Sequence, residues 1–187
     1  MSEEESIIFH HDTVEFVTVA AEFCGFLERT NRIERWEFID TALKILPLLY
    51  LKASLLPQCE QLGMDELETF VTEEDYEVVR LTVAEIMADK DDYLDVFLQD
   101  MRYSDIPIRK NISEDIADIY QDIKNFIEVF RLGFNDTMHD AIAICKENFA
   151  LYWGQTLVNT MRALHEVKFS NDTNENEMLQ HLSLIHI

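Results

Sequence analysis

Two pairs of side chains are spaced so that they could form a charge network or line a ligand pocket. Asp118 and Asp122 are four residues apart in a helical pattern, so they lie one turn apart on that helix. Arg162 and His165 are almost one turn apart in a later helical pattern. Carboxylates beside a guanidinium and an imidazole form strong charge-assisted hydrogen bonds. Such a group either fixes the register of two packed helices or binds a ligand.

The connection between these two helical patterns is short, because the first ends near Gly133 and the second begins near Asn135. A short connection favours antiparallel neighbours, so the four groups are expected to meet, with an aromatic side chain from each helix close by. The candidate charge network or pocket therefore consists of Asp118, Tyr120, Asp122, Trp153, Arg162 and His165. The sequence leaves both interpretations open, an ion-pair clamp or a ligand site.

A second group of acids has spacing typical of a metal site. Residues 73–77 read Glu-Glu-Asp-Tyr-Glu, and Asp92 and Asp95 follow. This is similar to nucleotide pyrophosphohydrolases of the MazG type, all-helical enzymes that hold magnesium with E-E-x-x-E and a later E-x-x-D. The second motif is shortened here, and a chain with 37 acids in 187 residues produces such spacings by composition. A solvated acidic face is the preferred interpretation, and a divalent-metal-dependent nucleotide pyrophosphohydrolase is the alternative.

The sequence holds no other catalytic signature. It has no G-x-S-x-G motif and no phosphate-binding loop, and its four glycines are too few to build much of a phosphate cradle. Asp136 and His139 have the spacing of a di-iron ligand pair, but a second copy is missing. We therefore expect no catalytic residue, no metal and no cofactor.

The charge of the chain restricts its partners. The formal net charge is −22, and such a surface repels nucleic acid and anionic membranes. Cys24, Cys59 and Cys145 are widely spaced and odd in number, which argues against a disulfide framework. The acidic start of the chain does not resemble a secretory leader, and its longest apolar run is too short to cross a bilayer. We expect a cytoplasmic protein that contacts another protein or a second copy of itself.

Apolar residues recur every three or four positions, so the expected fold is all-α, a bundle of five to seven helices. Helices are predicted over about 6–29 and 33–56, with Pro47 kinking the second, and over 72–88, where Thr72 and Asp75 form a near capping box. Residues 89–111 are the least clear, with a short helix possible around Tyr93. Another helix is predicted from an N-cap at Ser113 to Gly133, and a long last helix of about nine turns from Asn135 to about 167.

Residues 1–169 are predicted to be one helical domain, followed by a polar tail over 170–187. Polar and acidic residues dominate 170–177, whereas Leu182–Ile187 is apolar. The apolar ending is interpreted either as a non-native segment or as a small packing segment.

The segment from Ser113 to Lys124, which reads S-E-D-I-A-D-I-Y-Q-D-I-K, resembles the bacterial family catalogued as domain of unknown function 5063. The resemblance extends to Trp153-Gly154, to the sequence Arg-Ala-Leu-His over 162–165 and to the leucine-rich second helix, and so spans most of the chain. It implies a helical cytosolic protein with no assigned reaction. The family pattern places histidines beside the Trp-Gly pair, where this chain has Tyr152 and Thr156. We therefore expect an acidic helical module for protein interaction or structure.

Overall fold

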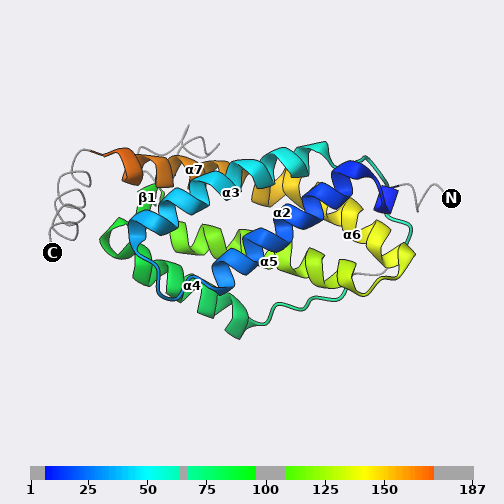
Figure 1. The fold of residues 1–187 in the computed structure, drawn as a ribbon, viewed down its shortest axis with the longest axis horizontal. Coiled ribbons are helices and arrows are strands. Elements are labelled where there is room, and N and C mark those ends of the chain that lie inside the picture. The colour runs from blue at the N-terminus through cyan, green and yellow to red at the C-terminus, as the bar shows by residue number, and fades with distance from the viewer. Residues whose placement is uncertain (1–6, 64–66, 96–107, 171–187) are drawn as a thin grey trace, which may run out of the picture.

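The computed structural model describes residues 7–63, 67–95 and 108–170, which form a helical bundle (Figure 1). Its α-helices are α2 (His11–Glu28), α3 (Arg35–Leu55), α4 (Glu73–Met87), α5 (Ile112–Arg131), α6 (Asn135–Asn148) and α7 (Gly154–Phe169). A π-helix (Phe149–Trp153) joins α6 to α7 in one C-terminal helix of 35 residues. A 3₁₀ turn (Ala88–Lys90) and the strands β1 (Asp92–Leu94) and β2 (Arg109–Asn111) complete the described elements. The all-α prediction is confirmed, with a small two-stranded ribbon added.

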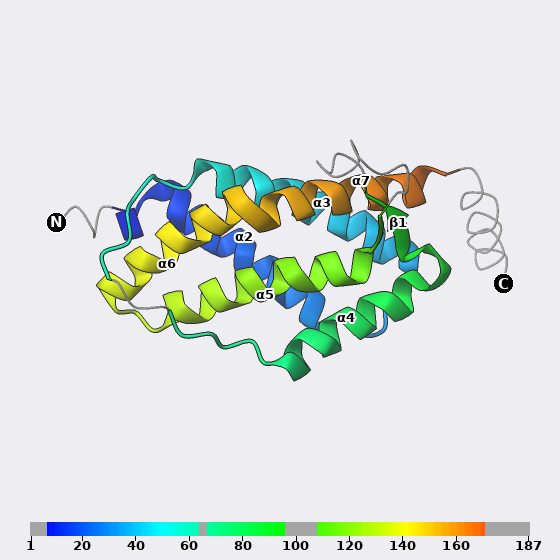
Figure 2. The same ribbon diagram turned by 180° about the vertical axis from the view of Figure 1, so that it is seen from behind.

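Helix α5 occupies the centre of the bundle and packs against α2, α4, α6 and α7 (Figures 1 and 2). Helix α3 packs against α2 on one side and α7 on the other. Buried apolar side chains from all of these helices form one cluster, which explains why each helix carries an apolar stripe. None of the helices in the described ranges has the length and hydrophobicity to span a bilayer.

The starts of α4 and α5 are fixed in different ways, the first by residues of the helix itself and the second by a side chain from outside it. The predicted capping box of α4 is confirmed, because the Thr72 hydroxyl accepts from the Asp75 N–H while the Asp75 carboxylate accepts from the Thr72 N–H. The predicted N-cap at Ser113 is wrong, because α5 already begins at Ile112. The Asp91 carboxylate instead accepts from both the N–H and the hydroxyl of Ser113, at 2.8 and 2.6 Å. A side chain from outside the helix therefore caps it.

The predicted helix around Tyr93 is also wrong for the part that the structure describes. Residues 92–94 form β1 and pair antiparallel with β2, with Tyr93 opposite Lys110. The Tyr93 hydroxyl donates to the buried carboxylate of Asp115, and this contact fixes the ribbon against α5. The rest of that predicted helix, from residue 96, lies outside the described residues.

The long last helix is confirmed as continuous, but the sequence analysis missed its π-helical turn. A π turn holds one extra residue, so it rotates the apolar stripe by about 100° around the helix. Because the stripe is broad, the apolar residues before and after the turn still overlap on one face, and the sequence pattern looks continuous. Gly154 follows directly, and a Cβ atom there would lie 2.3 Å from the carbonyl oxygen of Phe149. The glycine is therefore the residue that permits this local geometry.

Candidate functional site

Three of the six predicted site residues line one cavity between α5 and the C-terminal helix. Asp118 and Asp122 come from α5, and Trp153 comes from the end of the π-helix. We call this the acidic cavity, and its volume is about 450 Å³. Its other lining residues are Asp95, Lys110, Gln121, Leu151, Tyr152, Gln155, Thr156 and Asn159.

The ribbon supplies one wall of the acidic cavity and connects it to a buried polar network. The Lys110 ammonium lies 3.8 Å from the Asp95 carboxylate and 3.6 Å from the Asp115 carboxylate. Asn159 donates to Asp95 at 3.3 Å, and Thr160 donates to Asp115 at 3.4 Å. One ammonium therefore faces two buried carboxylates, which leaves the network with an excess of negative charge.

Burial controls the protonation of this network. Desolvation raises the pKa of the Asp115 carboxyl, although the Tyr93 hydrogen bond and Lys110 partly oppose the rise. Desolvation also raises the pKa of Tyr93, and the neighbouring Asp115 charge adds to the effect. Asp122 behaves in the same way, because burial raises the pKa of its carboxyl while its hydrogen bond from Asn148 lowers it. Raised carboxyl pKa values in a cavity wall are typical of both structural and functional sites.

A second cavity lies on the other side of the wall formed by Asp122 and Trp153, which line both cavities. We call it the apolar cavity, and its volume is about 390 Å³. Its apolar wall consists of Leu67, Phe126, Val129, Ala141, Ile144, Cys145 and Trp153, and its polar wall of Gln61, Glu68, Thr69, Asp122, Asn125 and Asn148. The Trp153 indole nitrogen is buried and has no hydrogen-bond partner among the described residues. The shared wall therefore contains both a partly buried carboxylate and an unsatisfied donor.

Loop residues that close the apolar cavity are held by two side chains of the bundle. The Asn125 amide oxygen accepts from the backbone N–H groups of Phe70 and Val71, at 2.7 and 2.9 Å. The Asp140 carboxylate accepts from the N–H groups of Leu62 and Gly63. These anchors fix the described parts of the connection between α3 and α4, residues 61–63 and 67–71, beside the cavity.

The predicted charge network takes a different form from the one expected. Asp118 accepts from the Tyr76 hydroxyl at 2.8 Å, and Asp122 accepts from Asn148 at 3.0 Å. Arg162 donates to the backbone oxygen of Leu94 at 2.7 Å, because the ribbon lies beside α7. The structure thus gives the two acids and the arginine separate partners.

The remaining two predicted residues make contacts elsewhere. The Tyr120 hydroxyl donates to Glu28 of α2 at 3.1 Å, and the His165 ring packs on Phe169 with centroids 4.5 Å apart. Sequence reasoning missed Lys110 and Asn159, because they come from the ribbon and from a helix face with no local motif, and it assigned Asp95 to the metal motif rather than to this cavity. The spacing of Asp118 and Asp122, by contrast, was sufficient to find them.

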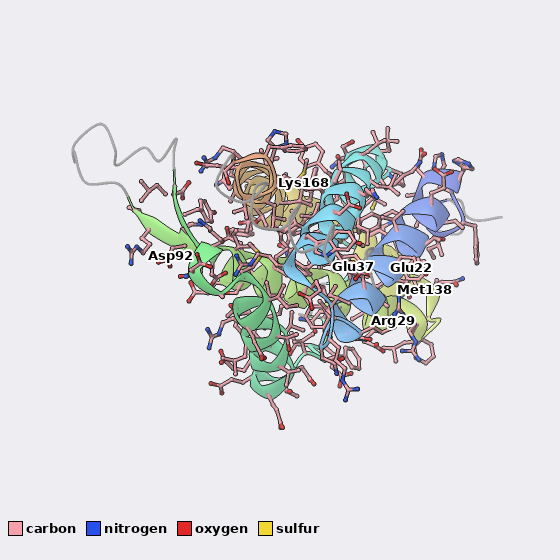
Figure 3. All side chains as sticks on the ribbon, turned by 60° about the vertical axis from the view of Figure 1, so that its left-hand side comes forward. Glu22, Arg29, Glu37, Asp92, Met138 and Lys168 are labelled. Carbon is pink, nitrogen blue, oxygen red and sulfur yellow. The ribbon has the colours of Figure 1, made fainter. Side chains whose placement is uncertain are left out.

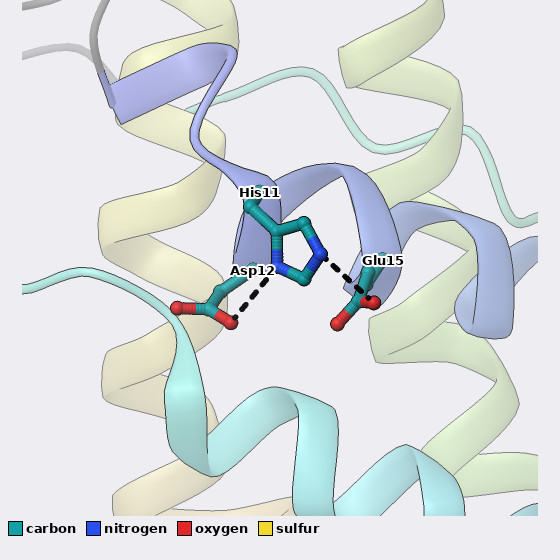
Figure 4. A group of neighbouring side chains, drawn as sticks. All are labelled: His11, Asp12 and Glu15. Carbon is teal, nitrogen blue, oxygen red and sulfur yellow. Dashed lines mark ion pairs between the residues drawn. The ribbon is translucent and has the colours of Figure 1, made fainter.

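The described residues contain one group with the spacing of metal ligands, His11, Asp12 and Glu15 at the start of α2 (Figure 4). The two His11 nitrogens lie 3.6 Å from Asp12 and 3.2 Å from Glu15. The other carboxylate oxygen of Glu15 pairs with the Lys52 ammonium, and the His11 side chain is 77% exposed. Ion pairing on the first turn of a helix explains this group without a metal.

The acids of the pyrophosphohydrolase motif contact different partners and do not converge on one site in the described residues. Asp75 belongs to the capping box, and Glu77 pairs with Arg80 at 2.7 Å. Asp92 pairs with Arg109, whereas Asp95 faces the acidic cavity. Asp92 on β1 also lies on a different element from Glu22 on α2 and Glu37 on α3 (Figure 3). The geometry gives the alternative function no specific support.

The outer face of α3 exposes several large apolar side chains. Its inner face packs into the bundle through Leu46, Leu49 and Ala53. Leu48, Leu51 and Leu55 are 43–50% exposed on its outer face, and Tyr50 is 40% exposed at the edge of this face, where it contacts Phe149. The sequence from 41 to 56 contains no acid. Helix α3 therefore has exposed apolar side chains outside the face that packs into the bundle.

Comparison with known proteins places this architecture in a family. The family model described as Domain of unknown function (DUF5063) matches residues 7–170, which include every described helix and both cavities. The chain belongs to this family. The chain is also 61% identical to protein BF1032 from Bacteroides fragilis, whose crystal structure superposes with a TM-score of 0.78. That match covers 88% of this chain and 96% of the other. No functionally curated protein matches the sequence.

Proposed function

We propose that this protein is a non-catalytic interaction module that pairs with a second copy of itself through the outer face of α3. The observation that supports the proposal is the half-covered apolar helix. Large exposed apolar patches on acidic, otherwise well-solvated proteins mark interaction sites. The face is defined by Pro47, Leu48, Tyr50, Leu51 and Leu55.

Charge favours a second copy as the occupant of this face. Two chains of formal charge −22 repel each other wherever acids meet. On α3, the Lys44 ammonium pairs with Asp40, and the Lys52 ammonium pairs with Glu15. The face is thus locally neutral, and a two-fold axis through it would bring apolar side chains together without opposing carboxylates.

The C-terminal helix lies beside α3. Lys168 pairs with Asp40 near the start of α3, whereas Phe149 contacts Tyr50 near its end, so the two helices run antiparallel. Leu151 and Val158 are exposed on that neighbour. A patch of a few partly exposed side chains is smaller than the ~800 Å² per partner of a standard interface. A weak, reversible dimer is the expected result.

The net charge and the cysteines bear on which partners and which compartment suit this protein. A surface with this excess of carboxylates disfavours nucleic acid and anionic lipid as partners. The three cysteines carry free thiols, and burial raises the pKa of Cys24 to about 12, so its thiol stays protonated. Free thiols suit a reducing compartment such as the cytoplasm.

Sedimentation equilibrium of the full chain and of Leu51→Glu tests the proposal. Leu51 is 50% exposed on the face, so the wild type should dimerise reversibly and the variant should stay monomeric to about 100 µM. Leu81→Glu is the matched control, because Leu81 is 56% exposed on α4. A monomeric wild type at these concentrations, or equal losses in both variants, would overturn the proposal.

A further inference from the structure

The apolar cavity has the dimensions and lining of a small-molecule site. Its volume of about 390 Å³ lies within the range of known ligand pockets, which are mostly apolar with a few convergent polar groups. Phe126 and Trp153 contribute flat aromatic surface, and Val129, Ala141 and Ile144 contribute aliphatic surface. A flat apolar body about the size of one aromatic ring fits these walls.

The polar end of the cavity lies at Asp122. One carboxylate oxygen accepts from the Asn148 amide at 3.0 Å. Among the described residues no side chain donates to the other oxygen, although Asp122 is only partly buried and lines the cavity. A carboxylate that is removed from bulk water in this way gains most from a ligand that donates N–H hydrogen bonds.

Trp153 adds a second polar group to the wall that the two cavities share. Its side chain is 1% exposed, and its indole N–H has no partner among the described residues. Unsatisfied buried donors are rare in folded proteins, and an absent water or ligand is a common explanation. An amide carries an acceptor next to its donor and could satisfy the indole as well as Asp122, whereas an amidinium carries donors alone and would satisfy only Asp122.

We propose that the apolar cavity binds a small aromatic compound with an N–H donor head, an amide or an amidine, whose donor contacts Asp122. Aromatic acids are excluded, because their carboxylate would face Asp122 within an already negative protein. This inference does not depend on the dimer, since α3 contributes no residue to the cavity lining.

Benzamidine, benzamide and benzoate test the proposal, because they share one ring and differ in the head group. The two tryptophans are Trp36 and Trp153, so Trp36→Phe leaves Trp153 as the fluorescent reporter. Titration into this full-length variant should give dissociation constants on the order of 1 mM for benzamidine and benzamide, as expected for such small compounds. Benzoate should leave Trp153 fluorescence unchanged.

Three further substitutions in the Trp36→Phe background locate the site. Asp122→Asn should weaken benzamidine about tenfold or more, since a hydrogen bond to a charged group is lost. Asp118→Asn should leave the affinity unchanged, because Asp118 lines only the acidic cavity. Ile144→Phe should block benzamidine and benzamide by filling the apolar cavity, and it provides a second test if Asp122→Asn fails to fold.

Several outcomes would overturn the proposal. They are equal binding of benzoate and benzamidine, equal losses in the Asp118 and Asp122 variants, unchanged binding in Ile144→Phe, or no fluorescence response to any probe.

Discussion

A Cβ atom on residue 154 would lie 2.3 Å from the carbonyl oxygen of Phe149 and 2.9 Å from its ring. Gly154→Ala should therefore lower the free energy of unfolding by about 1–3 kcal/mol, because backbone and ring must shift together. Thermal and urea unfolding measure the effect.

Gly25→Ala is the matched control for that prediction. Its Cβ atom would approach the terminal guanidinium nitrogen of Arg29 at 2.9 Å, and a flexible side chain can move away. Alanine favours a helix over glycine by roughly 1 kcal/mol, so this variant should be as stable as wild type or more stable. Equal destabilisation by both substitutions would contradict the role assigned to Gly154.

Asp91→Ala should destabilise the start of α5. Its carboxylate accepts from the Ser113 N–H and hydroxyl, and its backbone oxygen accepts from the Ile112 N–H. Removal of the carboxylate leaves buried donors without a partner and should cost about 1–3 kcal/mol in urea unfolding. Asp92→Ala removes a half-exposed acid one residue later and should cost under about 1 kcal/mol.

The buried carboxyl of Asp115 should make stability fall as the pH rises. Its pKa is raised above the usual 3.8, chiefly by desolvation, so the folded state holds the proton more tightly than the unfolded state. The stabilisation from this group is complete below pH 3.8 and is lost as the pH rises through the raised pKa. Asp115→Asn removes that titration, so its unfolding free energy should increase relative to wild type between about pH 4 and pH 7.

Urea unfolding at several pH values measures this difference. Glu114→Gln is the control, because it removes an exposed carboxyl one residue earlier. The difference in unfolding free energy between this variant and wild type should stay constant across the pH range. A constant difference between Asp115→Asn and wild type across this range would show that burial does not govern the group.

The helices were predictable because each carries an apolar stripe that the bundle core requires. Thr72 and Asp75 even gave the start of α4, since a capping box is a local interaction. The start of α5 was not predictable, because its cap comes from Asp91 across a two-stranded ribbon. Strands of three residues have too little pattern to detect, and the π turn changes the stripe by a single residue.

In the candidate site, too, the residues with a local helical pattern were predictable, and those that depend on the ribbon were not. Asp118, Asp122 and Trp153 were found because helical spacing places them on the facing sides of neighbouring helices. Arg162 was expected beside the acids, but it donates a hydrogen bond to the backbone oxygen of Leu94 instead. Leu94 belongs to the ribbon, which the sequence analysis did not detect. Lys110 was missed for the same reason, because only the strand pairing brings it to the cavity.

Asn125 should control access to the apolar cavity, because one side-chain oxygen holds two consecutive backbone N–H groups of the covering loop. Asn125→Ala removes that acceptor, so the amide hydrogens of Phe70 and Val71 should exchange with solvent at least about tenfold faster. Hydrogen exchange followed by mass spectrometry measures the change in this segment.

Two comparison variants separate the acceptor from the side chain as a whole. Asn125→Asp keeps an oxygen acceptor of the same shape and should retain most of the protection, whereas Gln121→Ala changes an exposed side chain on the same helix and should have no effect. If Asn125→Asp exposes the loop as fully as Asn125→Ala, packing rather than the paired hydrogen bonds holds the loop closed. Because the Asn125 oxygen is fixed by α5 at the cavity wall, we expect the acceptor to decide the outcome.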